Sequence, residues 1–172
     1  MTETEVESLL RIAAVCVACA GAWTDWKSYR IPNRLTGSCM AAGLILRFLL
    51  MGGNGFLTGL AGWGAGALGM VLWSLGAMKA GDIKLYMAIG ALGGWKFCFQ
   101  TEIVSILLGG VVALVLMIRR GGRNHPWRRL WIYWENLFLG GKLTIYEGSK
   151  DSQFCFGWII AAGALAAYFW PL

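Results

Sequence analysis

Two aspartates differ from the other acidic residues of this sequence in where they lie. Of nine acidic residues, only Asp25 and Asp82 lie at the ends of apolar runs that would meet on one side of a membrane. Two carboxyl groups held close together tend to share one proton. The ionised member can take a proton from water while the protonated member polarises a carbonyl group, which suits hydrolysis of a peptide bond. The alternative is that each aspartate caps a helix or pairs with a nearby lysine.

The elements that must position these aspartates are membrane-spanning helices. Apolar residues make up 58% of the 172 residues and charged residues 14%, whereas soluble domains are about 25% charged. A run of about 20 apolar residues spans a bilayer, and lipid offers no partner for an open strand edge. Six runs qualify, at about 8–25, 35–51, 56–78, 85–99, 102–118 and 154–171. We therefore expect an all-α membrane protein of about six transmembrane helices, forming one polytopic domain over residues 1–172.

The basic residues predict how the helices are threaded. Twelve of the fifteen Lys and Arg residues fall in three connecting segments on one side of a six-helix threading. These segments are 26–34, 79–84 and 119–153. Because cytoplasmic loops carry the excess of Lys and Arg, this side is predicted to be cytoplasmic and both termini to lie outside. The net charge of +6 then reports membrane topology, and we expect no nucleic-acid partner.

Three basic residues depart from this distribution. Arg11, Arg47 and Lys96 lie close to the predicted outer ends of spans. Long basic side chains in such places can extend to the membrane interface while their stems stay in lipid. We therefore expect all three to snorkel outward.

The basic segment 119–153 leaves room for structure outside the spans. Asn124-His125-Pro126 is a helix-start signal, and apolar residues then recur at helical spacing from Trp127 to Phe138 with charged residues between them. This pattern is typical of an amphipathic helix lying in a membrane interface. We predict one such helix on the cytoplasmic side.

Glycines in the third run predict close packing of helices. They recur at intervals of three and four residues, at Gly55, Gly59, Gly62, Gly66 and Gly69. Small residues at this spacing let a second helix backbone approach closely, which is the main source of helix association in lipid. We therefore expect the third helix to lie at the centre of the bundle.

The cysteines give no sign of a bound group. All five lie within apolar runs and their number is odd, so we expect neither a disulfide framework nor a zinc site. A pair of carboxyl groups also needs no metal for the chemistry described above. We therefore predict no metal and no cofactor.

The residues around the two aspartates form two short motifs. Asp25 precedes Ile31-Pro32-Asn33, a rigid turn that can restart a helix, and Asp82 lies in Gly81-Asp82-Ile83-Lys84. Gly81 permits close backbone approach that a side chain would block. With these motifs the chain resembles the type IV prepilin peptidases. These are polytopic aspartyl proteases whose first aspartate precedes an Ile-Pro-Asn element and whose second lies in Gly-x-Gly-Asp-x-Lys.

The resemblance runs from about residue 10 to about residue 95 and implies a role for each matching residue. Asp25 and Asp82 would be the catalytic aspartates. The supporting residues would be Ile31, Pro32, Asn33, Gly81 and Lys84. At the first glycine of the second motif this chain has Lys79, which changes the local loop and adds a cation that could lower the pKa of Asp82.

The resemblance also implies which members of the family are most similar. Bifunctional members carry a cytoplasmic insert with paired Cys-x-x-Cys elements and methylate the new N-terminus. Here the one Cys-x-x-Cys, Cys16 to Cys19, lies inside the first run, and the loop 26–34 is too small for a methyltransferase. The chain is therefore similar to the short peptidase-only members that serve Flp-type (tight-adherence) pili.

A substrate and a location follow from the resemblance. The expected partners are the lipid bilayer and a prepilin or pseudopilin with a short basic leader, a glycine and an apolar helix. The protein would sit in the bacterial cytoplasmic membrane with its active site facing the cytoplasm. Since the loops here are basic as well, we expect docking to depend on helix contacts more than on charge.

Two other functions stay open. Intramembrane acids also mark proton-coupled transporters, although such proteins show repeated halves and broken helices that this sequence lacks. Lys79 in place of glycine would also suit a catalytically silent scaffold for pilus assembly.

Overall fold

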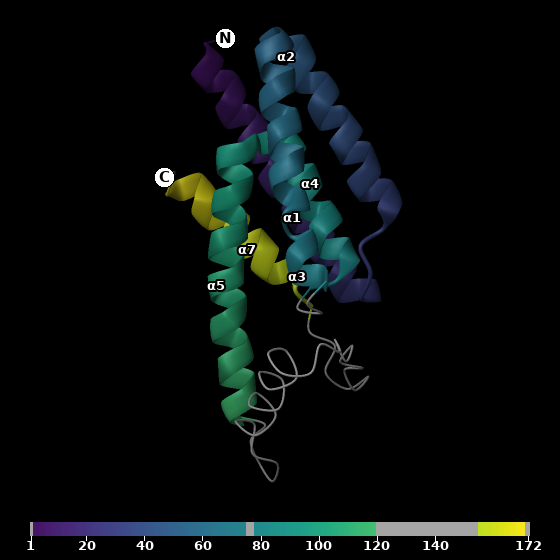
Figure 1. The fold of residues 1–172 in the computed structure, drawn as a ribbon, viewed down its shortest axis with the longest axis vertical. Helices are drawn as coiled ribbons and strands as arrows, with labels where there is room; N and C mark the ends of the chain where they lie inside the picture. Colours follow the sequence, from purple (N-terminus) through teal and green to yellow (C-terminus); the bar gives the residue numbers. More distant parts are fainter. Residues whose placement is uncertain (1, 75–77, 120–154, 171–172) are drawn as a thin grey trace.

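The computed structural model describes residues 2–74, 78–119 and 155–170 as a bundle of helices (Figure 1). Within these ranges every regular element is an α-helix. The helices are α1 (Glu3–Ser28), α2 (Asn33–Ala67), α3 (Met70–Ser74), α4 (Ala80–Gly93), α5 (Trp95–Arg119) and α7 (Gly157–Phe169). The predicted interfacial helix and nearly all of the segment 119–153 lie outside the described residues.

The segments long and apolar enough to cross a membrane are Glu3–Ser28, Asn33–Ser74 and Trp95–Leu116, and α7 is a shorter apolar helix. The prediction of an all-α membrane protein is confirmed. Six crossings, and the side on which each terminus lies, stay predictions.

The limits of helix α1 are fixed by a cap at each end, and its packing is determined by one face of mainly small side chains. Thr2 and Glu5 form a capping box, in which the Thr2 N–H donates to Glu5 Oε2 at 2.8 Å. At the other end Tyr29 adopts a left-handed conformation, and its N–H donates to the Asp25 carbonyl at 2.7 Å. The buried face follows a spacing of three and four residues, through Val6, Leu10, Ala14, Ala18, Gly21, Ala22 and Asp25. Asp25 is thus the last residue of the face that packs on the bundle.

Helix α2 folds back on itself at Gly52. This residue has φ 65° and ψ −153°, a conformation open essentially to glycine alone. Figure 1 shows the chain rising through the first half of α2 and descending through the second. The predicted break between the second and third runs is therefore confirmed. The third run was expected to continue to residue 78, whereas α2 ends at Ala67 and is followed by α3.

The boundary predicted between the fourth and fifth runs is wrong. It was placed near residues 100 and 101, but the helices break at Gly94, where φ is 82°. The apolar run stops at Gln100, Thr101 and Glu102, yet α5 continues through them and buries all three side chains. A glycine that can adopt positive φ ends the helix, whereas polar residues with packed surroundings do not.

Helix α4 lies at the centre of the bundle. Eleven of its residues are buried, including every position from Leu85 to Gly93, as expected of a helix that is apolar on all sides. The third predicted helix, which was expected to be central, corresponds mainly to the second half of α2. It supplies the glycines against which α4 packs. A Cβ on Gly66 would lie 2.5 Å from the Met87 nitrogen, so only glycine allows this approach. The predicted close packing at these glycines is confirmed, but the central helix is α4 and not the helix that carries the glycines.

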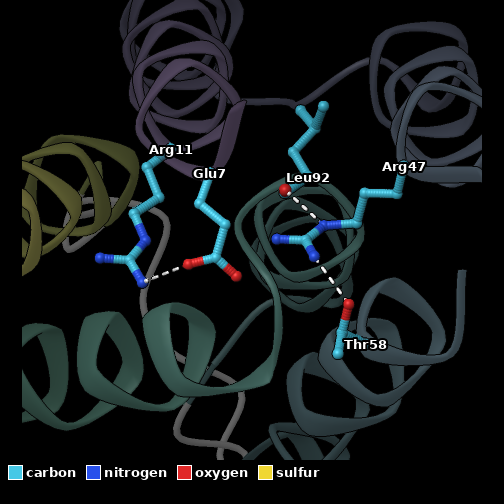
Figure 2. A network of polar contacts seen from close by, with 5 residues as sticks. All are labelled: Glu7, Arg11, Arg47, Thr58 and Leu92. Carbon is cyan, nitrogen blue, oxygen red and sulfur yellow. Dashed lines mark hydrogen bonds and ion pairs between the residues drawn. The ribbon is translucent and has the colours of Figure 1, made fainter. Parts of the chain in front are cut away.

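Arg47 does not extend to the membrane interface as predicted. Its side chain is 1% exposed, and it donates from Nε to the Leu92 carbonyl at 2.8 Å and from a terminal nitrogen to Thr58 Oγ1 at 2.7 Å. Figure 2 shows this network beside the ion pair of Glu7 and Arg11, which are 3.4 Å apart. Buried Arg47 binds a carbonyl of the last turn of α4 and so fixes the end of α4 opposite to Asp82. Exposed Lys96 lies over the ring of Trp95.

Candidate active site

Asp25 lies in the last turn of α1 with its carboxylate at the start of α7. The residue is 2% exposed, and Oδ2 accepts a hydrogen bond from the Gly157 N–H at 3.1 Å. A Cβ on Gly157 would lie 3.1 Å from the Asp25 Cβ, so glycine lets the two helices meet here. The first N–H groups of a helix lack partners within the helix, and the start of α7 therefore supplies a hydrogen-bond donor to the Asp25 carboxylate.

Asp82 lies in the first turn of α4, outside the three segments long enough to cross a membrane. It is 2% exposed, and its Oδ2 accepts from the Lys79 N–H at 3.2 Å. The pKa of Asp82 is raised to about 6: burial is the largest cause and the neighbouring Asp25 carboxylate adds to it, while the backbone hydrogen bond and the charge of Lys79 oppose the rise. The lowering effect expected of Lys79 is present but is outweighed by burial.

The two aspartates lie within electrostatic range of each other at one end of the bundle. The charge of Asp25 acts on Asp82. Cys155 lies beside Asp25: its Sγ is 3.8 Å from the Asp25 carbonyl oxygen. Partial burial, then the charge of Asp25, raise the pKa of the Cys155 thiol, and Lys79 lowers it. The chain thus brings together two carboxylates that are far apart in sequence.

Both aspartates also bind N–H groups at helix starts, as expected under the alternative that each of them only caps a helix. Asp82 binds an N–H at the start of its own helix, and Asp25 binds one at the start of α7. Capping alone, however, does not require a carboxylate to be buried. Here both are buried, and the charge of Asp25 acts on Asp82. The arrangement therefore goes beyond what capping requires.

A second contact joins the two motifs. Lys84 Nζ donates to Asn33 Oδ1 at 2.8 Å, although the residues are 51 positions apart. Pro32 is the N-cap of α2 with φ −64°, and Asn33 is the first residue of that helix. The hydrogen bond ties the beginning of α2 to the first turns of α4. All of the motif residues therefore lie around one end of the bundle.

Ile31 and Gly81 are in contact, but without the close approach expected of Gly81. Ile31 is buried, and a Cβ on Gly81 would lie 3.5 Å from the Ile31 Cβ, an ordinary van der Waals distance. Gly81 does not have positive φ either. Within the described part of the chain, no steric reason requires glycine at this position.

Sequence reasoning missed two residues near this end. Glu102 was not singled out from the sequence, but it is 7% exposed within α5 and lines a small pocket with Tyr86. Gly157 was not considered, although it donates to Asp25. A polar group inside an apolar run was the available signal for Glu102, and no local signal marks Gly157. Among the described residues, no group of three His, Cys, Asp or Glu side chains is placed to hold a metal.

Fold and site together define a class: a helical membrane protein with a pair of buried, interacting aspartates at one end of its bundle. The model of the type IV leader peptidase family matches residues 12–114 of this chain. The chain belongs to that family. The matched range contains both aspartates, the Ile31-Pro32-Asn33 turn and Lys84.

One curated relative is the prepilin peptidase EppA of Methanothermobacter thermautotrophicus. The alignment is 35% identical over 106 positions and covers 58% of this chain and 26% of the relative. The chain thus spans about a quarter of the length of this relative. No solved structure matches the chain significantly.

Proposed function

We propose that this protein is an aspartyl endopeptidase that removes the leader peptide of type IV prepilins of the Flp kind, without a methyltransferase activity. The observation that carries the proposal is the pair of buried aspartates in the two matching motifs, where the charge of Asp25 acts on Asp82. Membership of the leader peptidase family supports it. The name of the curated relative supports a prepilin as the substrate.

The surroundings of the two carboxylates give each a role in hydrolysis. Asp82, whose pKa is raised to about 6, holds the shared proton and donates it to the oxygen of the scissile carbonyl. Asp25, whose Oδ2 accepts an N–H at the start of α7, is the other member of the pair and removes a proton from water. The water oxygen bonds to the carbonyl carbon, and the C–N bond then breaks as the nitrogen takes a proton.

The basic residues near this end support a cytoplasmic site. Lys27 lies in the last turn of α1, Lys79 precedes α4, and Lys84 lies one turn into α4. Under the positive-inside rule these residues mark the cytoplasmic face, the face at which a prepilin presents its leader. We therefore place cleavage at the cytoplasmic surface of the plasma membrane of a bacterium.

A defined precursor tests the proposal. The purified chain, in phosphatidylcholine and phosphatidylglycerol vesicles, is expected to cut a protein that carries a basic leader, a glycine and an apolar helix. Mass spectrometry should locate a single cut after the glycine. Absence of cleavage by wild type, with normal pilus export in cells, would instead identify a scaffold. Proton-driven uptake of a solute without any cut would identify a transporter.

Cleavage is expected to fall as the pH rises above about 6, the pKa of Asp82. Below this pH Asp82 keeps the proton that it donates, and above this pH the proton is lost. The decline of the rate on the alkaline side therefore reports the apparent pKa of the aspartate pair. Because the charge of Lys79 lowers the pKa of Asp82, Lys79→Gln should move this decline to higher pH. Initial rates measured between pH 4 and pH 9 check both statements. Lys96→Gln, a change to an exposed residue beside Trp95, should leave the profile in place, and a shift of the Lys79→Gln profile to lower pH would contradict the assignment.

A further inference from the structure

A small, partly open pocket is lined by Tyr86, a residue of α4 near Asp82. It has a volume of about 140 Å³ and lies between the α2–α3 junction, α4 and α5. Tyr86 follows Asp82 by one turn of α4, so the two side chains lie on the same face of that helix. Apart from Tyr86 and Glu102, its walls are mainly apolar and include Leu68, Leu72, Phe99 and Ile106. The pocket is thus close to the aspartate pair and separate from it.

Glu102 brings an unpaired carboxylate oxygen into this pocket. The residue is 7% exposed, and its Oε1 is buried without a hydrogen-bond partner among the described residues. The Tyr86 side chain, 1% exposed, is an electrostatic neighbour of both Glu102 and Asp82. A buried carboxylate without a partner is costly, most of all inside a membrane protein, where such groups mark functional sites. A group that donates hydrogen bonds would remove this cost.

The chemistry of the lining selects the kind of group that fits. A carboxylate accepts hydrogen bonds and binds cations, and a phenol hydroxyl can both donate and accept. The remaining walls suit a hydrocarbon side chain. The matching ligand is a primary ammonium group attached to an apolar residue.

We propose that this pocket binds the newly formed N-terminal ammonium group of the cleaved protein, with the first apolar side chain against Leu68, Leu72 and Ile106. The inference rests on the proposed function, because hydrolysis of the precursor creates such an amine on the side of the apolar helix. When the C–N bond breaks, the nitrogen leaves as an amine and takes up a further proton from water. Glu102 then holds the ammonium group in this pocket, outside the aspartate pair, where it cannot attack the carbonyl carbon again.

Peptide binding tests the pocket independently of cleavage. The probe is the apolar segment that follows the cut, labelled with a fluorophore at its C-terminus and carrying either a free or an acetylated N-terminus. In vesicles of phosphatidylcholine and phosphatidylglycerol, the free amine should bind wild type at least about tenfold more tightly than the acetylated peptide, as expected for a charge-assisted hydrogen bond. Glu102→Gln should remove this difference. Equal affinities of the two peptides for wild type would overturn the inference.

A second variant covers the possibility that Glu102→Gln fails to fold. A Cβ on Gly69 would lie 3.9 Å from Glu102 Oε1 and no closer than 3.4 Å to any other group. Gly69→Leu should therefore fill the pocket without disturbing the backbone and should abolish the preference for the free amine. The control is Gly110→Leu on α5, where a Cβ would meet nothing within 4 Å. A preference that persists in Gly69→Leu would count against the pocket.

Two further arms separate this inference from its alternatives. Vesicles that contain phosphatidylethanolamine offer a lipid ammonium group. If that lipid displaces the free-amine peptide from wild type and has no effect on Glu102→Gln, the occupant is a lipid headgroup and the inference is wrong. If the precursor is never cut, the proposed function fails, whereas a free-amine preference that is lost in Glu102→Gln would still establish an ammonium site.

Discussion

Asp25→Asn, Asp82→Asn and the double variant are each expected to lose roughly a thousandfold or more of the cleavage rate, and to lose it to the same extent. Groups that act as one catalytic unit show such non-additivity, because the reaction stops once either member is removed. Two independent electrostatic contributions would instead multiply. The comparison of the single variants with the double variant therefore tests the shared role, beyond the need for each residue.

The structure explains why asparagine is the informative replacement. Oδ2 of Asp25 accepts from the Gly157 N–H, and Oδ2 of Asp82 accepts from the Lys79 N–H. The amide oxygen of asparagine can accept the same hydrogen bonds, so the helix ends stay capped while the titrating group is lost. Thermal unfolding midpoints in detergent should stay within a few degrees of wild type, and the loss of rate then reports chemistry.

Initial rates on the defined precursor provide the measurement, with Glu7→Gln as the matched control. Glu7 forms an ion pair with Arg11 on α1, far along the helix from Asp25. Its replacement removes one carboxylate from the same helix and should leave the rate within about twofold, because exposed ion pairs contribute little. Full activity of Asp82→Asn would rule out the pair as the catalytic group. A double variant that loses the product of the two single losses would rule out the shared role.

The sequence predicted the aspartate pair because charges are so scarce in it. With nine acidic residues in the whole chain, the threading of apolar runs left Asp25 and Asp82 at one end of the bundle. The fold class followed from the same composition. The fold-back near Gly52 was also predictable, since a gap separates two apolar runs there.

Features that depend on packing between distant segments were not predictable. The break at Gly94 and the burial of Arg47 were predicted wrongly, and the burial of Glu102 was not predicted. Apolar runs indicate which segments can lie in lipid, but they do not show how those segments pack on one another. Arg47 is held by the Leu92 carbonyl and by Thr58, neither of which is adjacent in sequence. The contact of Gly157 with Asp25 likewise joins residues 132 positions apart. A single sequence gives no signal for such pairs.

The second large effect is expected at the crossing of α2 and α4. Gly62→Ala or Gly90→Ala should destabilise the fold by about 3 kcal/mol or more and abolish cleavage. A Cβ on Gly62 would lie against the Gly90 carbonyl oxygen and 2.8 Å from the carbonyl carbon of Gly94. These neighbours are backbone atoms, so no side chain can move aside and the two helices must separate. Since α4 carries Asp82, their separation also displaces the candidate active site.

Gly64→Ala is the matched control, and its effect on stability is expected to be opposite to that of Gly62→Ala. It lies on the same helix, two residues from Gly62, but a Cβ there would meet nothing within 4 Å. Alanine is favoured over glycine within a helix by up to about 1 kcal/mol, so Gly64→Ala should raise the unfolding midpoint slightly while Gly62→Ala lowers it sharply. Thermal unfolding in detergent and cleavage rates in vesicles measure both. If Gly62→Ala and Gly64→Ala were equally stable, α2 and α4 would not cross at these glycines, and the position of Asp82 at the end of α4 would need another explanation.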